Sequence, residues 1–279
     1  MAAVNPPPVD AIRFAGNGEE LAPHISAAAE PLGHFGPFTF TNSMLMMFIT
    51  MALLLVVAWL ASRRIRQDPE GALVPEGLQN AAEAVVEFLD ELVQSTVGKT
   101  YAQRLLPIGA TFFIFILVAN WFSLIPGIGT IWLVVPDPHD PAHEIAAPIF
   151  RPATADINMT LALAILAFLV IHGSGIRAHN PVGHIKEMSQ VALLAPVFIL
   201  IELFVVISLS FRLFGNLFAG EVVLNGPILA GFALGHIPLI GVVFLVLELL
   251  FGLVQAVIFF MLSMVFTGQA VAESGHEAH

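Results

Sequence analysis

Long runs of apolar residues restrict the fold of this chain more than any other feature of its sequence. With 57% hydrophobic and 11% charged residues, the chain is not a soluble globule. A helix needs about 20 mostly apolar residues to cross a bilayer. We therefore predict an all-α integral membrane protein with five transmembrane helices. The expected spans are 41–61, 105–125, 156–176, 190–223 and 238–268.

Residues 78–97 follow a different pattern, which predicts one amphipathic surface helix. Apolar side chains such as Val85, Leu89 and Val93 recur with the helical period, while Glu83 and Glu87 face the other way. Helices that bind anionic lipid usually carry a basic polar face, whereas this one is acidic. The pattern therefore favours docking on another protein subunit.

The rest of the chain is organised around a single membrane domain, expected at residues 39–272. Residues 1–38 are rich in Pro, Gly and Ala, and we expect a loose external N-terminal tail. Residues 273–279 are expected to form a cytoplasmic C-terminal tail. The loop at 127–153 holds two His and three acidic residues between Asp137 and Glu144. Without helical spacing or a rigid frame, these residues indicate a solvated polar loop rather than a metal site.

The last two apolar runs are longer than a bilayer requires. About 30 helical residues extend ~45 Å, against a hydrocarbon core of ~30 Å, so we expect both helices to be strongly tilted. The basic residues set the orientation, because they gather on one side of a five-span arrangement. The positive-inside rule then puts the N-terminus outside and the C-terminus in the cytoplasm. That side carries Arg63, Arg64, Arg66, Lys99, Arg104, Arg177 and Lys186, and the other carries Arg13 and Arg151.

Composition excludes several classes of function. The formal net charge of -11 argues against nucleic acid as a partner. The chain has no cysteine, so disulfides, thiol chemistry and Cys-ligated metals are ruled out. Gly98-Lys99-Thr100 resembles the end of a phosphate-binding loop, but position 93 is Val rather than the required glycine. We expect neither a metal nor a cofactor.

One arginine stands in the middle of the fourth apolar run and is the strongest functional candidate. An arginine at the centre of a span costs about 2.5–3.5 kcal/mol, and Leu or Met would serve the helix better than Arg212 does. Ser208, Arg212 and Asn216 recur every four residues and so form one polar stripe. Something polar or ionic is expected to pass in front of that stripe.

The hairpin formed by the last two helices predicts which polar residues face one another. Reflection about its turn sets Arg212 opposite Gln255 and Glu221 opposite Glu248, with the acids about 13 Å nearer the outside. Two carboxylates that face each other in a low dielectric are expected to share protons. Other interpretations stay open: Glu221 reaching to the interface, a structural role for Glu248, and Asn216 and Gln255 acting only as interhelical hydrogen bonds.

Asp156 also has two interpretations. It precedes the third apolar run, where a carboxylate caps free backbone amides, and the alternative is a role in ion access.

The stretch Ser208-Leu-Ser-Phe-Arg-Leu-Phe-Gly-Asn-Leu-Phe-Ala-Gly-Glu221 closely resembles subunit a of the bacterial F-type ATP synthase. Supporting matches are Ala155-Asp-Ile-Asn-Met-Thr160, Gln79-Asn80, Asn120-Trp-Phe-Ser-Leu-Ile-Pro126 and Gln255. The resemblance covers about residues 36–272.

The resemblance implies a role for each site residue. Arg212 would be the essential arginine that faces the rotating c-ring, with Asn216 and Gln255 lining the same contact. Glu221 would be the outer-channel acid, and Glu248 stands where some members carry His and others Glu. The family often has a glutamate about fourteen residues before the arginine, whereas Glu202 is ten before it, so its place on the proton path is left open.

The resemblance also implies a biological setting. The chain would be one copy in a hetero-oligomeric complex in the cell membrane, in contact with c-ring subunits, b-type peripheral stalk subunits and lipid. It would not be an enzyme by itself, since the ADP chemistry belongs to other subunits. Proton and sodium coupling both stay open, because the ion site would lie on the ring.

Two other classes of function compete with this assignment. A secondary transporter or proton antiporter would use the arginine as an anion clamp, and would need a central cavity with broken helices. A purely structural membrane subunit would leave the arginine and the two acids unexplained.

Overall fold

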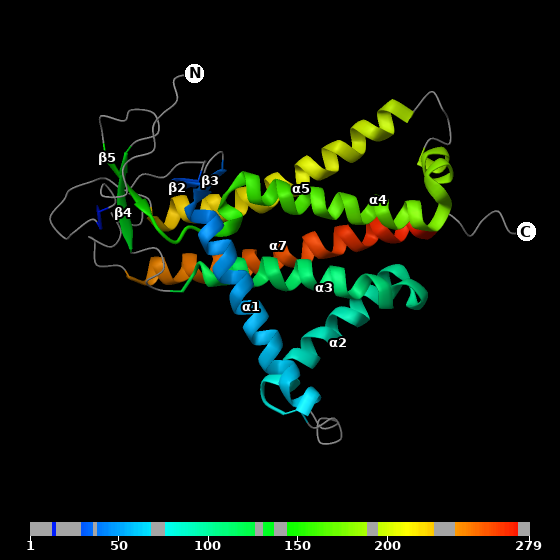
Figure 1. The fold of residues 1–279 in the computed structure, drawn as a ribbon, viewed down its shortest axis with the longest axis horizontal. Helices are drawn as coiled ribbons and strands as arrows, with labels where there is room; N and C mark the ends of the chain where they lie inside the picture. Colours follow the sequence, from blue (N-terminus) through cyan, green and yellow to red (C-terminus); the bar gives the residue numbers. More distant parts are fainter. Residues whose placement is uncertain are drawn as a thin grey trace, which may run out of the picture. The chain divides into compact units, whose positions relative to one another are not determined.

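The computed structural model describes eight ranges of the chain, which contain six α-helices and five short strands (Figure 1). The described residues are 13–14, 29–35, 38–67, 76–125, 131–136, 144–188, 195–225 and 238–272. The helices are α1 (Asn42–Gln67), α2 (Leu78–Val97), α3 (Lys99–Phe122), α4 (Ile157–Met188), α5 (Ala195–Asn225) and α7 (Pro238–Ala272), with a 3-10 turn η4 (Ala153–Ala155). The strands are β1 (Arg13–Phe14), β2 (Pro31–Phe35), β3 (Phe38–Thr41), β4 (Trp132–Pro136) and β5 (Glu144–Pro148).

Five of these helices are long and apolar enough to cross a membrane, which confirms the predicted number of membrane-spanning helices. They are α1, α3, α4, α5 and α7. Several helices extend further than hydropathy indicated: α1 continues to Gln67 rather than ending at 61, α3 begins at Lys99 rather than 105, and α4 continues to Met188 rather than ending at 176. The reason is that hydropathy marks only the apolar part of a helix. Polar residues continue the backbone hydrogen bonding beyond it.

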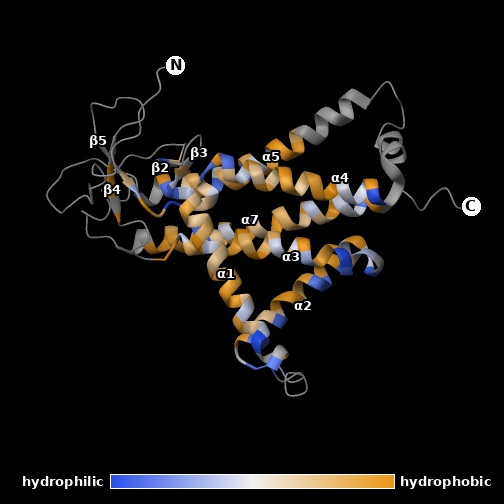
Figure 2. Ribbon diagram, in the orientation of Figure 1, coloured by the Kyte–Doolittle hydropathy of each residue, from blue (hydrophilic) through white to orange (hydrophobic). Residues whose placement is uncertain are grey.

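Helix α2 has the predicted bounds and the predicted two-sided character. Leu89 and Val93 are buried, while Glu83, Glu87 and Glu91 are exposed. Figure 2 shows hydrophilic and hydrophobic residues mixed along α2. Gly98, at φ 78°, separates α2 from α3, because glycine adopts this left-handed backbone readily.

The described chain divides into two compact units. The first contains residues 1–50, 118–160 and 212–253, and the second contains 51–117, 161–211 and 254–279. In the first unit, two side chains at the end of α3 donate hydrogen bonds to the backbone of α7. Asn120 Nδ2 donates to the carbonyl of Gly252 at 3.1 Å, and Trp121 Nε1 donates to that of Leu249 at 3.0 Å.

In the second unit, aromatic side chains join α3 to α7. The rings of Phe112 and Phe259 lie 5.5 Å apart, and those of Phe113 and Phe260 lie 6.0 Å apart. Gly109 makes this approach possible, since a β-carbon added there would meet Phe260 Cε2 at 2.7 Å. Close packing of large rings against a glycine therefore sets the distance between α3 and α7.

The first unit also contains two small antiparallel sheets that the apolar pattern did not predict. One has the order β1-β4-β5, with Leu133 paired to Ala147, and the other pairs β2 with β3. Parts of the expected loose tail and of the 127–153 loop are therefore strands. Residues 137–143 of the polar loop, most of residues 1–38, and the C-terminal tail from 273 lie outside the described residues.

We expect Gly109→Val to lower the stability of the second unit by about 1–3 kcal/mol, because the added methyl groups would enter space that Phe260 and Met264 fill. Gly173→Val is the matched control, since a β-carbon at Gly173 meets nothing within 4 Å. Thermal unfolding in detergent micelles measures the difference. Equal unfolding midpoints for the two variants would contradict this account of the α3–α7 packing.

Candidate functional site

Helix α5 carries its polar stripe on an exposed face. Ser208, Arg212 and Asn216 are all exposed, whereas Leu213 and Leu217 on the opposite side are buried. A helix with this burial pattern packs into its own chain through leucines and turns its guanidinium outward. The structure thus agrees with the predicted single polar stripe.

Arg212 has no ion pair or hydrogen bond with the described residues of its own unit. The carboxylate of Glu221, on the same helix, pairs with a different arginine. An exposed guanidinium in the middle of an apolar helix is costly in lipid, so it needs a partner that the described residues of this unit do not provide.

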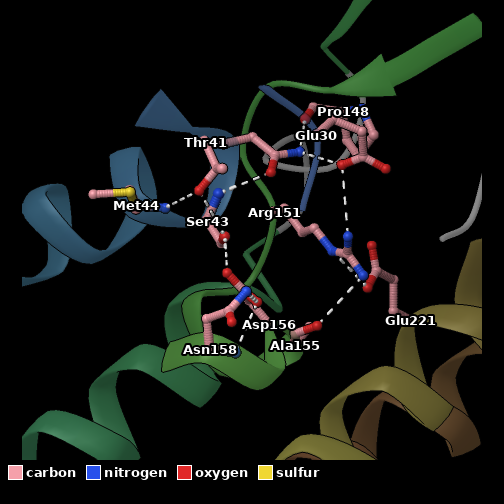
Figure 3. Close-up of polar contacts among 11 residues, drawn as sticks. Glu30, Thr41, Ser43, Met44, Pro148, Arg151, Ala155, Asp156, Asn158 and Glu221 are labelled. Atoms are coloured by element: carbon pink, nitrogen blue, oxygen red, sulfur yellow. Dashed lines mark hydrogen bonds and ion pairs between the residues drawn. The ribbon is translucent and has the colours of Figure 1, made fainter. Parts of the chain in front are cut away.

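Glu221 is buried near the C-terminal end of α5 and binds Arg151. It is 8% exposed, and its Oε2 accepts a hydrogen bond from Arg151 Nε at 3.2 Å (Figure 3). This ion pair is inside the protein, which disfavours the alternative that Glu221 merely reaches to the interface. A buried carboxylate is tolerable here because a charged donor compensates it.

Arg151 joins three parts of the first unit. Besides Glu221, it pairs through Nη1 with Glu30 Oε2 at 3.5 Å, and Nη2 donates to the carbonyl of Ala155 at 3.4 Å. Glu30 Oε2 also accepts from Asn42 Nδ2 at 2.7 Å, at the start of α1. Glu30 and Glu221, which are far apart in the sequence, therefore share one buried guanidinium (Figure 3).

Asp156 occupies the N-terminus of α4, as its sequence position predicted. Its Oδ1 accepts a hydrogen bond from the backbone N–H of Asn158 at 3.0 Å, which confirms the capping role. Its other oxygen accepts from Ser43 Oγ at 2.9 Å and so joins α4 to α1.

Glu248 is buried on α7 and faces α5, as the hairpin analysis predicted. It is 9% exposed, and a β-carbon built on Gly220 would lie 2.7 Å from its Cδ. Its carboxylate interacts electrostatically with Glu221. Oε2 of Glu248 has no hydrogen-bond partner within the described part of the chain. The two predicted acids are therefore brought together, and one of them keeps a free acceptor.

A cavity of about 210 Å³ lies beside Glu248. This volume is enough for several water molecules, and Asn216 and Glu248 supply the polar atoms that ordered water needs. The cavity extends along α5 from Gly220 to Asn216, which is one helical turn from Arg212. Its other lining residues are Leu217, Ala219, Phe244, Leu247, Phe251 and Gly252.

Two of the predicted site residues stand apart from this group. Gln255 is buried in the second unit, so its pairing with Arg212 across the two units stays a prediction. The side chain of Glu202 lies outside the described residues, although its backbone belongs to α5. No group of three or more possible metal ligands occurs among the described residues.

Arg151 and Glu30 belong to the site, although no motif in the sequence marks them. The sequence does hold one signal for Arg151, because Arg13 and Arg151 are the only basic residues expected on their side of the membrane. A buried acid such as Glu221 therefore has few cations available for pairing on that side. Glu30 gave no signal, because it stands in a Pro- and Ala-rich segment without periodicity.

Comparison with known proteins matches this chain to one family. A family model described as "ATP synthase A chain" matches residues 44–268. ATP synthase subunit a of Mycobacterium ulcerans is 35% identical over 209 residues, covering 74% of this chain and 79% of the relative. That of Gloeobacter violaceus is 30% identical over 260 residues, covering 93% of each. The chain therefore belongs to the ATP synthase A chain family.

Proposed function

We propose that this chain is the stator subunit that carries protons beside the rotating c-ring, through two offset half-channels separated by Arg212. As a member of its family, it is a multi-pass, proton-translocating subunit of the ATP synthase membrane sector and works in a hetero-oligomeric complex. The half-channels and the role of the arginine are the proposal.

The exposed stripe on α5 carries this proposal. Arg212 faces outward between Ser208 and Asn216, on a helix whose other side is buried. A mid-membrane cation on an outward face fits a partner that brings a carboxylate past it. A ring whose subunits each carry one carboxylate would present such a group repeatedly.

The outer half-channel is supported by the cavity and the two acids. Protons would enter from outside, reach Glu221 and Glu248, and pass through the water-sized space toward Asn216 and the ring. Glu248 suits a relay because its Oε2 has no fixed partner among the described residues.

The arginine would separate this path from a second half-channel open to the cytoplasm. Its permanent charge favours the deprotonated ring carboxylate as that group passes, and repels protons that would cross directly. Each proton that moves down the potential supplies about 2.3 kcal/mol per 100 mV, so a leak would dissipate the driving force. Ser208, Gln255 and, if its side chain reaches the path, Glu202 are proposed to line the ring contact and the inner side.

The remaining expectations follow from the same assignment. The chain itself would carry out no ADP chemistry, and α2 would dock on the b-type peripheral stalk. The outward N-terminus, the cytoplasmic C-terminus and the location in the cell membrane are proposed from the distribution of Arg and Lys. The transporter alternative finds less support, because α5 and α7 are continuous helices rather than broken ones.

We expect Arg212→Ala to abolish ATP-driven proton pumping in vesicles that contain the complex, while the complex still assembles. Assembly should persist because the guanidinium is exposed and makes no ion pair or hydrogen bond with the described residues of its unit. Arg177→Ala is the control, since it removes the same charge from an exposed position at the end of a span. Quenching of a pH-sensitive dye measures pumping.

Arg212→Lys should also fail largely, because lysine lacks the fork of donors and can lose its charge when desolvated. Normal pumping by Arg212→Ala would refute the assignment.

We expect Gly220→Val to slow proton flow through the membrane sector by about tenfold or more, because its side chain would occupy the position of the Glu248 carboxyl and displace it. Gly173→Val serves as the control with free space. Passive proton uptake by vesicles stripped of the nucleotide-binding sector measures the effect. An unchanged rate would remove Glu248 from the path.

If protons are the coupling ion, ATP synthesis driven by an imposed pH gradient and potential should proceed at the same rate in sodium-free buffer as with added sodium. Glutamates can relay protons along a path because they take up and release them, whereas a sodium path needs several oxygen ligands at each site. The measurement is luciferase-detected ATP from reconstituted vesicles. A rate that rises in proportion to added sodium would contradict proton coupling.

A further inference from the structure

Arg151 and Glu30 form a buried charge cluster with Glu221, and neither of these two residues has a part in the path described above. The guanidinium of Arg151 is 1% exposed and uses all three of its nitrogens. Nε binds Glu221 at 3.2 Å, Nη1 pairs with Glu30 at 3.5 Å, and Nη2 donates to the carbonyl of Ala155 at 3.4 Å. Arg151 is thus fixed from three sides, and its charge is shared between Glu221 and Glu30.

Glu30 is held in place independently of Arg151. Asn42 Nδ2 donates to its carboxylate at 2.7 Å and also to the carbonyl of Pro148 at 2.9 Å. The backbone N–H of Asn42 donates to the backbone carbonyl of Glu30 at 3.1 Å. Glu30 is only 3% exposed, so a charged group from the N-terminal segment is built firmly into the protein.

Two carboxylates of the cluster, those of Glu30 and Glu221, lie against the same guanidinium. Arg151 Nη1 is 3.5 Å from Glu30, and Nε is 3.2 Å from Glu221. Glu248 interacts electrostatically with Glu221 from α7, and Asp156 is bonded to Ser43 and Asn158. The positive charge of Arg151 is therefore divided between two buried acids. Buried charges that share a partner are costly and often mark functional sites.

We infer that Arg151 is a positioning residue for proton uptake, and that Glu30 shares its charge so that Glu221 is held in place without being fully neutralised. Arg151 directs the Glu221 carboxylate toward Glu248, while Glu30 takes part of the electrostatic attraction. Glu221 then stays able to accept a proton from outside and pass it on. This inference rests on the proposed function, since it assigns a duty at the outer end of that path.

The variant Glu30→Gln tests the inference with little disturbance of the fold. The amide keeps an oxygen that accepts from Asn42 and Arg151, while one negative charge is lost. Arg151 would then neutralise Glu221 alone, and protons would compete less well for it. We expect passive proton uptake by the complex to slow, and its pH profile to move to lower pH by about one unit. Glu76→Gln, an exposed acid in the segment before α2, is the matched control and should change neither.

A double-mutant cycle with Arg151→Gln separates charge sharing from scaffolding. Arg151→Gln leaves both carboxylates without their cation, and we expect uptake to fall by about tenfold or more. Adding Glu30→Gln removes one of the two unbalanced charges, so the double variant should conduct better than Arg151→Gln alone. If Glu30 and Arg151 served only as a structural clasp, the double variant would conduct no better than the single one.

Each result has a defined consequence. The inference is overturned if Glu30→Gln assembles normally and keeps the rate and pH profile of the unaltered complex, or if its rate falls while the pH profile stays in place. The Glu30→Gln measurement tests the inference even when the Arg151 variants fail to assemble. Arg212→Ala in the same vesicles distinguishes failure of this inference from failure of the proposed function. If only the inference is wrong, Arg212→Ala stays inactive. If the proposed function itself is wrong, Arg212→Ala pumps protons.

Discussion

The cost of holding charge inside a bilayer controls the rest of this structure. A cation in mid-membrane must be neutralised, hydrated or covered by a partner. The described residues of the first unit leave Arg212 exposed and do not neutralise its charge. The buried acids face the same constraint in a different way. Glu221 has a cation beside it, whereas Glu248 has a cavity and a free oxygen among the described residues.

The membrane helices could be predicted from the sequence because lipid makes the apolar pattern nearly decisive. Hydropathy found the five spans, and the helical period found α2 with its bounds. The same signal gave no information about where helices continue beyond the membrane, so α1, α3 and α4 extend further than predicted. The short strands were missed because edge pairing between short segments of four or five residues leaves little periodicity.

The candidate site was predicted in part. Residues that share a helix or a hairpin could be related by spacing alone, and the approach of Glu248 to α5 followed from that geometry. Arg151 and Glu30 could not be found this way, because their contacts join the loop before α4 and the N-terminal segment to α5. Spacing along one element does not encode such contacts between distant segments. The pairing of Arg212 with Gln255 stays a prediction.

The shared guanidinium has a consequence for how the subunit is made. Glu30 lies before α1, whereas Glu221 lies on α5, so Glu30 is synthesised earlier. The acid cluster around Arg151 is therefore complete only when α5 has joined segments made well before it. Until then, the guanidinium of Arg151 lacks its hydrogen bond to Glu221.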